Sequence, residues 1–372
     1  MTLIAAPYDE STPDLLTRTL THVVNATIVT QAGDEIPLDL ESGSLRWDET
    51  QSPRVQANLT CMLPDDPALL WRIDPRLGTR VVIEVGYLRP EGWYDIHRVA
   101  DLGLRTRTVH RPDRLLDLEA HSDEALLIDN APSTSLTLNT ATTTAAITTV
   151  ITSALTPYLP IVVTAPAGPA VNQTQLDADK WETVADLADG INAQVYDDGL
   201  RQWHVAPRVT ALAADPVYEL TVGASGTIIS ASQGLSRVPD VGGWANRVYL
   251  RYQWTDTAGT DHLVTSVKQV TSGPYRADTG NVTVLRLERE VATTQARADA
   301  AAAALVARTV TRGATFDQTA IAAYWLRPGM TVGITQEVGD RVKHVLSAVE
   351  FDLVAGTMRV TPRLPDNTGS IG

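Results

Sequence analysis

Three adjacent acidic pairs come closest to the residue pattern of a hydrolytic site. Two carboxyl groups that face each other across a substrate can act as general acid and general base on a glycosidic bond. The carboxyl groups of a glycosidase come from separate segments, however, whereas neighbouring residues in a turn diverge. We therefore expect all three pairs to be solvated turn residues. The pairs are Asp65-Asp66, Asp123-Glu124 and Asp197-Asp198.

Histidine, cysteine and serine also lack the spacing that chemistry needs. No two of the seven histidines are two, three or four residues apart, so no local zinc ligand pair exists. The single cysteine, Cys61, rules out an intrachain disulfide, and its alternating context predicts a small buried side chain. The segment GASG at residues 223–226 is one residue too short for a nucleophile elbow. The sequence thus predicts no catalytic residue, no cofactor and no metal ligand.

Tryptophan is the prominent aromatic residue, with eight Trp against two Phe. A sugar-binding platform is one use for such side chains. No two of them cluster in the sequence, which favours anchors of the hydrophobic core at strand ends. They are Trp47, Trp71, Trp93, Trp181, Trp203, Trp244, Trp254 and Trp325.

Composition limits the class of protein. The 372 residues are 44% hydrophobic and carry a formal net charge of −14, which predicts two to four domains with a sizeable core. No stretch approaches the roughly 20 apolar residues that span a bilayer. The start of the sequence lacks the basic and apolar regions of a secretory signal, so we expect synthesis in the cytoplasm and no stable membrane insertion. No run of Lys or Arg exceeds two, which argues against DNA binding through clustered cations.

A first β domain is predicted over residues 23–130, after a lead-in over residues 1–22. Alternation of apolar and polar residues is cleanest over residues 54–63, which places one face of that strand on a core. About six strands within about 100 residues are typical of a barrel or a sandwich. The other expected strands are 25–30, 35–40, 79–87, 93–109 and 114–120.

A small α/β insert is predicted over residues 131–235. Helical spacing of apolar residues indicates a helix that stops at Pro157. A second helix follows the capping box that begins at Asp179. Two strands then flank the dipeptide Asp198-Gly199, a strong signal for a tight hairpin turn.

A second β-barrel-like domain is predicted over residues 236–372. Its helix at 293–310 contains five consecutive alanines, so it should pack flat against a sheet. The expected fold is therefore mainly β with a helical minority, in which two β-barrel-like tube domains flank a small α/β module. No short-period repeat is visible. The expected strands are 247–254, 261–270, 280–291, 330–335, 342–353 and 358–364.

The order of several motifs resembles the baseplate hub (tail hub, or minor tail) proteins of long-tailed, siphovirus-type phages. DKWETVADLADGINAQVYDDGLRQWHVAPR matches their Trp, short amphipathic helix, strand, Asp-Gly turn and second strand. ANRVYLRY resembles the Asn-led strand of the later barrel, and YWLRPGMTVGIT resembles a turn and strand that follow an Ala-rich helix. Together with RVQANLTCML, these motifs extend the resemblance from residue 23 to residue 364. The structural motif candidates are Trp181, Asp198, Gly199, Pro207, Asn246, Pro328 and Gly329.

This resemblance implies a non-enzymatic structural protein of the virion tail tip. Hubs of this kind are homotrimers, and two barrel domains from each subunit form a pseudo-sixfold ring that continues the tail tube. The implied partners are the distal tail protein, the C-terminus of the tape-measure protein, and tip or fibre proteins. DNA would pass through during ejection without specific binding. The sequence ends soon after the second barrel, unlike hubs that carry a hydrolase domain.

The acidic balance suggests a hypothesis about the channel. A wall that repels phosphate would let DNA pass, so we expect acidic side chains on inward-facing strands. Three alternatives remain open. They are another tail component such as a distal tail protein or host-binding adhesin, a tail-associated cell-wall hydrolase, and an unrelated soluble β protein.

Overall fold

The computed structural model confirms a mainly β protein, with 45% strand and 18% helix. Strands form one large sheet and three small ones. None of the helices in the described residues is long and apolar enough to cross a membrane. The structure describes residues 6–16, 21–130, 137–155, 159–173, 180–222, 227–235, 243–255, 259–278, 280–290, 292–312, 314–335 and 341–363.

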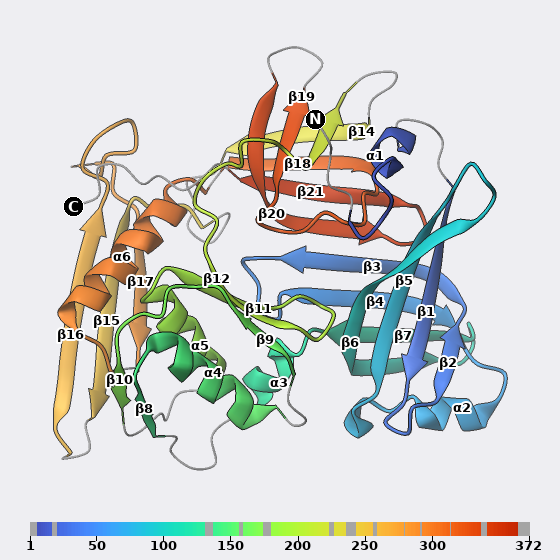
Figure 1. The fold of residues 1–372 in the computed structure, drawn as a ribbon, viewed down its shortest axis with the longest axis horizontal. Helices are drawn as coiled ribbons and strands as arrows, with labels where there is room; N and C mark the ends of the chain where they lie inside the picture. The colour runs from blue at the N-terminus through green and yellow to red at the C-terminus, as the bar shows by residue number, and fades with distance from the viewer. Residues whose placement is uncertain are drawn as a thin grey trace.

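The large sheet has 13 strands in the order β14-β18-β21-β20-β3-β4-β7-β6-β5-β1-β2, with β19 beside β20 and β13 beside β19. All neighbours are antiparallel except β13 and β19. Figure 1 shows the central strands stacked from β18 down to β4. The sheet does not close into a barrel among the described strands, so the expected barrels are not confirmed. The strands are β1 His22–Val29, β2 Glu35–Leu38, β3 Leu40–Asp48, β4 Val55–Met62, β5 Arg80–Leu88, β6 Tyr94–His110, β7 Leu115–His121, β13 Tyr218–Thr221, β14 Ile228–Leu235, β18 Ala314–Ile321, β19 Thr331–Thr335, β20 Val342–Asp352 and β21 Thr357–Arg363.

The core of this sheet joins both ends of the chain. The Tyr87 hydroxyl donates a hydrogen bond to the Ala322 carbonyl at 2.6 Å and accepts one from the Tyr324 amide at 3.0 Å. Tyr8, ahead of the short helix α1 (Thr12–Leu15), is also buried and donates to the Val85 carbonyl at 3.0 Å. The predicted lead-in is thus partly docked on the sheet. Two short helices, α2 (Pro67–Arg72) and η1 (Pro75–Leu77), precede β5.

The α/β module has its own hydrophobic core, in which Trp203 is fully buried and lies 6.4 Å from Trp181 between ring centroids. Its β11–β12 hairpin turns at the predicted Asp198-Gly199. Pro157 and Asp179, which were predicted to end one helix and cap another, lie outside the described residues. The elements are α3 Glu124–Asp129, β8 Leu138–Thr140, α4 Thr143–Ala154, β9 Ile161–Val163, β10 Val171–Gln173, α5 Lys180–Asp189, β11 Ala193–Asp197 and β12 Trp203–Pro207.

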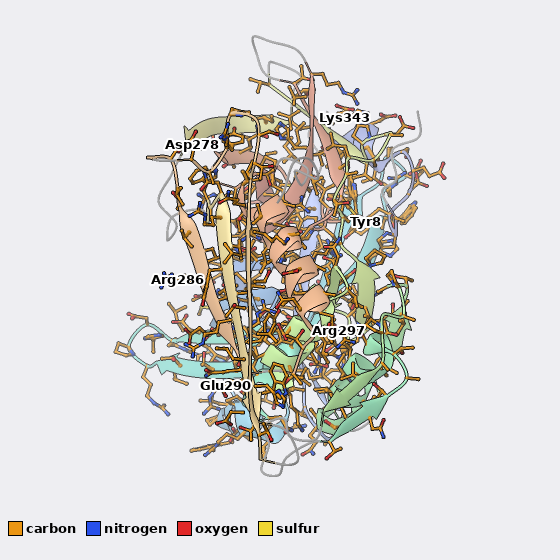
Figure 2. All side chains as sticks on the ribbon, turned by 90° about the vertical axis from the view of Figure 1, so that its left-hand side faces the viewer. Tyr8, Asp278, Arg286, Glu290, Arg297 and Lys343 are labelled. Atoms are coloured by element: carbon orange, nitrogen blue, oxygen red, sulfur yellow. The ribbon has the colours of Figure 1, made fainter. Side chains whose placement is uncertain are left out.

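A third unit consists of a three-stranded sheet and the Ala-rich helix α6 (Gln295–Thr309). Ala298, Ala301 and Ala302 are fully buried against the sheet, which confirms that the helix packs flat. Figure 2 looks onto this unit, with Arg286 on β17 and Arg297 on α6. The strands are β15 Arg247–Thr255, β16 Asp261–Gln269 and β17 Val284–Arg289.

The predicted domain ranges do not coincide with these three cores. Residues 218–235, expected in the insert, supply β13 and β14 to the large sheet. Residues 243–310, expected in the second barrel, form the separate third unit. The reason is that strands of the large sheet pair across long sequence separations, which local patterns do not reveal.

Asp189 of α5 ties the third unit to the α/β module. It accepts from Arg208, from Arg289 at 2.9 Å and from Arg308 at 3.2 Å. Burial alone would raise the pKa of Asp189, but the three arginines hold that pKa below its ordinary value. The neighbouring Asp186 also binds Arg289. This buried network fixes α6 and β17 on α5.

Candidate functional site

The large sheet contains the same arrangement of strands twice. One half has the order β14-β18-β21-β20-β19, and the other has β3-β4-β7-β6-β5. Every neighbouring pair within each half is antiparallel. In both halves the strands follow one another along the chain in the same order. The halves differ only in where the inserted units leave and rejoin the sheet. The large sheet is therefore built on an internal structural repeat.

The register of the repeated ladders is also the same. β20 and β21 form seven residue pairs with one bulge, between Leu346 and Ala348. β6 and β7 form seven pairs with the bulge at the same step, between Leu104 and Thr106. A bulge bends a strand and increases its twist, so equal placement gives both halves the same local curvature.

The two first ladders of the halves agree in the same way. β3 and β4 form seven pairs with a bulge between Leu40 and Ser42. β14 and β18 form seven pairs with a bulge between Ile228 and Ser230. Two independent coincidences of bulge position indicate that β14 corresponds to β3 and β20 to β6.

The two halves are joined by β20 and β3. Glu350 lies opposite Arg46, and Asp352 lies opposite Ser44. The backbone amide of Leu353 continues the ladder by donating to the Gly43 carbonyl at 2.9 Å. Eight strands, from β14 to β6, therefore run as one uninterrupted sheet.

One face of these strands is polar and forms an open groove of about 700 Å³ that crosses the joint. We call it the polar face. Period-two alternation explains it, because β4 buries every second residue and leaves Asn58 exposed and Thr60 half-buried. The charged residues that line the groove are Asp117, Glu119, Glu350, Asp352 and Arg359. Acidic side chains thus predominate there.

Hydrogen bonds from neighbouring side chains hold Asp117 on the polar face. The Thr60 hydroxyl donates to Asp117 Oδ1 at 2.8 Å, and the His110 ring lies 2.7 Å from Asp117 Oδ2. These contacts lower the pKa of Asp117, with the Thr60 bond as the largest cause. Glu119 lies 3.0 Å from the His121 ring. The lowered pKa favours the negatively charged form of Asp117 on this face.

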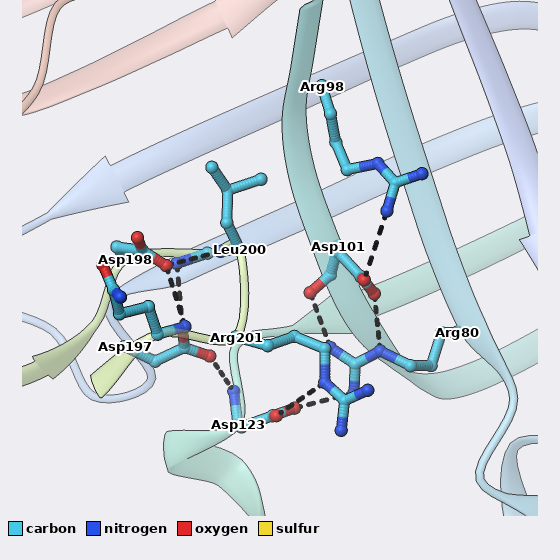
Figure 3. A network of polar contacts seen from close by, with 10 residues as sticks. Arg80, Arg98, Asp101, Asp123, Asp197, Asp198, Leu200 and Arg201 are labelled. Atoms are coloured by element: carbon cyan, nitrogen blue, oxygen red, sulfur yellow. Dashed lines mark hydrogen bonds and ion pairs between the residues drawn. The ribbon is translucent and has the colours of Figure 1, made fainter. Parts of the chain in front are cut away.

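A second group of acidic residues lies where the α/β module meets the sheet (Figure 3). Asp123, Glu124 and Asp197 are at most 1% exposed. The Asp123 amide donates to Asp197 Oδ2 at 2.8 Å, and the Asp197 amide donates to Glu124 Oε1 at 3.2 Å. The expectation that these two acidic pairs are solvated is wrong, because docking of the module buries both turns. The third pair behaves as expected, with the Asp65 side chain 94% exposed.

Burial changes the protonation of this cluster. It raises the pKa of Glu124 to about 7. It raises the pKa of Asp197 to about 8, and the nearby Asp123 charge adds to the increase. Both groups nevertheless accept backbone hydrogen bonds, and Asp197 Oδ1 binds the Gly199 amide at 3.1 Å. The carboxylate oxygens of Glu124 and Asp197 are thus occupied by backbone amides of the chain itself, which joins the α/β module to the sheet.

Arg80 completes the docking site from the sheet side. Its guanidinium contacts Asp101 Oδ1 at 2.5 Å and Asp123 Oδ1 at 2.8 Å (Figure 3). The Asp101 amide donates to the Gly199 carbonyl at 2.7 Å. The hairpin turn of the module is therefore fixed to β6 through its backbone.

The motif candidates are dispersed over the three units. Trp181 packs at the edge of the module core, and Pro207 ends β12 at an exposed position. Asn246 is fully buried ahead of β15, where its amide nitrogen donates to the carbonyls of Tyr275 and Asn281. Pro328 and Gly329 form the turn before β19, and the Gly329 amide donates to the Leu346 carbonyl at 2.7 Å.

Of the tryptophans, Trp47, Trp203 and Trp325 are core residues at 2% exposure or less. Trp71 and Trp93 are 76% and 53% exposed, so the expectation of core anchors is wrong for these two. Cys61 is buried as predicted, and burial raises the pKa of its thiol to about 12. Among the described residues, no group of three potential ligands is placed to hold a metal ion.

By sequence, the chain matches no protein-family model and none of the curated proteins. By fold, it is similar to solved tail proteins. A tail protein from Neisseria meningitidis MC58 superposes with a TM-score of 0.62 at 14% identity, over 91% of this chain and 96% of that one. The 43 kDa tail protein of prophage MuSo2 from Shewanella oneidensis gives 0.62 at 14%, over 91% and 98%. The prophage tail protein gp18 from Listeria monocytogenes EGD-e gives 0.53 at 12%, over 93% and 95%.

Proposed function

We propose that this chain is a structural, non-enzymatic component of a phage-type tail tip, namely a baseplate hub. Three copies form a ring that continues the tail tube and lines part of the DNA-ejection channel. The ring links the distal tail protein to tip or fibre proteins, and the end of the tape-measure protein lies in its lumen. The fold shared with three tail proteins supports the tail location.

The observation that carries this proposal is the internal repeat. A subunit with two equivalent halves presents two tube segments, so three subunits present six. A ring of six equivalent segments matches a sixfold tube, although its own symmetry is threefold. The two tube domains of the hub correspond to the two halves of the sheet, closed by neighbouring copies rather than as separate barrels.

The dimensions of such a ring fit a channel. Three copies with eight strands each bring 24 strands to the wall. With strands about 4.8 Å apart, the circumference is about 115 Å and the diameter about 37 Å, and strand tilt widens it further. Barrels of about 16–18 strands already leave an aqueous channel, so 24 strands enclose a wider one.

The polar face suits the inside of this channel. The charged residues that line its groove are four acidic residues and one arginine. Negative charge on a wall repels phosphate and lowers non-specific retention of DNA, which binds proteins mainly through cations. The opposite face of the same strands packs on the hydrophobic core and leaves no alternative lining.

Size-exclusion chromatography with light scattering tests the stoichiometry. The chain has a mass of 40.1 kDa, so the ring should have a mass of about 120 kDa. A protein that remains at the monomer mass up to millimolar concentration contradicts a self-assembling hub. A stable dimer contradicts the threefold arrangement.

A further inference from the structure

The run of eight strands from β14 to β6 is open at both of its ends. The last part of β6, residues 105–110, pairs with β7 on one side only. β14 pairs with β18 on one side only. Within the part of the chain that the structure describes, no strand covers the other side of either segment. Open edges offer unpaired amides and carbonyls, and soluble proteins normally protect them.

The chain itself contains the joint that these edges lack. β20 corresponds to β6, and β3 corresponds to β14, by sheet order and by bulge position. Within one chain, β20 pairs with β3. The equivalent partner of β6 is therefore a β14, and the β14 of the same chain lies at the other end of the eight-strand run (Figure 1).

We propose that β6 of one copy pairs with β14 of the next copy and so repeats the β20–β3 joint between subunits. This inference rests on the proposed hub function and adds to it the interface and its register. The contact is heterologous, since each copy offers β6 on one side and β14 on the other. A joint that repeats the internal one closes the eight-strand runs of the copies into a continuous ring.

The internal joint fixes the register of the new one. Counting from the shared bulges, Asp352 corresponds to His110 and Glu350 to Thr108. By the same count, Ser44 and Arg46 correspond to residues 232 and 234. His110 of one copy then lies opposite Ser232 of the next, and Thr108 lies opposite Gly234.

The internal joint also tells which pairs carry hydrogen bonds. In this joint the Leu353 amide donates to the Gly43 carbonyl and the Glu49 amide donates to the Ser347 carbonyl, which makes the Asp352–Ser44 step a non-hydrogen-bonded pair. Cα atoms in such pairs are about 4.5 Å apart, within the range that a disulfide bridges. Position 110 and position 232 are therefore suited to cross-linking.

Oxidative cross-linking tests this register. Cys61→Ala removes the only native thiol, and His110→Cys with Ser232→Cys supplies the matched pair. The control combines Ser232→Cys with Thr106→Cys, which is displaced from the matched position by four residues, or about 13 Å. We expect the matched pair to give dimers and then covalent trimers on non-reducing gels, at least tenfold more than the control.

The outcomes separate the interface from the function. A trimer by light scattering in which the matched pair stays reduced, or cross-links no better than the control, overturns the joint and leaves the hub proposal intact. Cross-linked species larger than a trimer on the gel would show that the copies form open filaments, which overturns ring closure. A matched variant that stays monomeric and uncross-linked contradicts both proposals.

Val109→Pro supplies a second test that does not depend on cysteines. By correspondence with Phe351, the Val109 amide faces the neighbouring copy rather than β7. Proline is tolerated at an edge strand when its missing amide was not bonded within the fold. We expect a folded monomer, whereas Val109→Ala keeps the ring. A Val109→Pro variant that still forms trimers overturns the joint.

Discussion

Gly199, at the turn between β11 and β12, lies so close to Val55 that a Cβ atom at position 199 would be 3.2 Å from Val55 Cγ2. Its φ is +80°, a conformation that favours glycine. Two independent constraints thus meet at a residue that the sequence marks only as a turn. The same turn binds β6 through its carbonyl, so it docks the α/β module on the sheet.

Gly199→Ala should lower the free energy of unfolding by on the order of 2–3 kcal/mol, since strain at positive φ adds to the crowding against Val55. Gly33→Ala is the matched control, with φ +85° and nothing within 4 Å of the added Cβ. It should lose only about 1–2 kcal/mol. Urea unfolding measures both. Equal losses would show that the contact with Val55 is unimportant.

Stability should fall as pH rises, because of Asp197 and Glu124. The folded-state pKa values of about 8 and about 7 lie above those of the unfolded chain, so the folded protein keeps protons that the unfolded chain has released. Their stabilising contribution is complete below about pH 4 and is lost as pH rises through 7 to 8. Each linked proton contributes a slope of about 1.4 kcal/mol per pH unit.

Asp197→Asn should remove about one linked proton, so the free energy of unfolding should fall less steeply with pH. Chemical denaturation between pH 5 and pH 8 measures this slope. Asp65→Asn makes the same substitution at an exposed position and serves as the control for the substitution itself. An Asp197→Asn variant with the slope of the unmodified protein would mean that the Asp197 carboxyl ionises normally in the folded state.

Asn246→Ala should destabilise the third unit. It removes two donated bonds and the bond from the Thr283 amide to the Asn246 Oδ1 atom at 2.9 Å, and it leaves buried partners unsatisfied. We expect a loss of about 2–4 kcal/mol. The backbone amides of β15, β16 and β17 should exchange hydrogen faster than in the unmodified protein. Asn139→Ala, at an exposed position on β8, should change nothing, and a similar effect there would contradict the role of Asn246.

Reversing charge on the polar face should make the ring retain DNA. Glu119→Lys with Glu350→Lys replaces two of the four acidic residues that line the groove. At about 50 mM salt, we expect duplex DNA to bind at least tenfold more tightly than to the unmodified ring, and binding to weaken steeply with salt. Fluorescence anisotropy measures both quantities.

The control for charge places the same two reversals elsewhere. Glu288 and Glu290 are exposed at β17, and Figure 2 shows Glu290 there. Glu288→Lys with Glu290→Lys therefore changes the net charge equally without touching the polar face. Equal DNA binding by both variants would indicate a general charge effect and would argue against a lumenal polar face.

The sequence predicted many of the strands that bury one face, although it did not predict β3 or β13. β4 follows the alternation expected for residues 54–63, and β20 and β21 lie where apolar runs predicted them. It did not predict β14 or β18, because segments such as IISASQGL carry few apolar residues and owe their structure to pairing with distant strands. The repeat is invisible in sequence for the same reason, since register and bulges conserve backbone geometry rather than side chains.

The buried carboxyl cluster was missed for a different reason. Asp123-Glu124 and Asp197-Asp198 have the sequence of solvated turns, and nothing local indicates that the two turns meet. Their burial depends on Arg80, which neutralises Asp123, and on backbone amides that occupy the remaining oxygens. The only sign in the sequence was the presence of two acidic pairs. Such pairs are too common in proteins to indicate a buried cluster.

The most direct test of the ring is negative-stain electron microscopy of the purified chain with two-dimensional class averages. A baseplate hub should appear as a threefold ring with a central pore and six wall segments in the end-on view. Compact particles without a pore would contradict the hub proposal, provided that the His110→Cys/Ser232→Cys protein forms no ring at the same concentration.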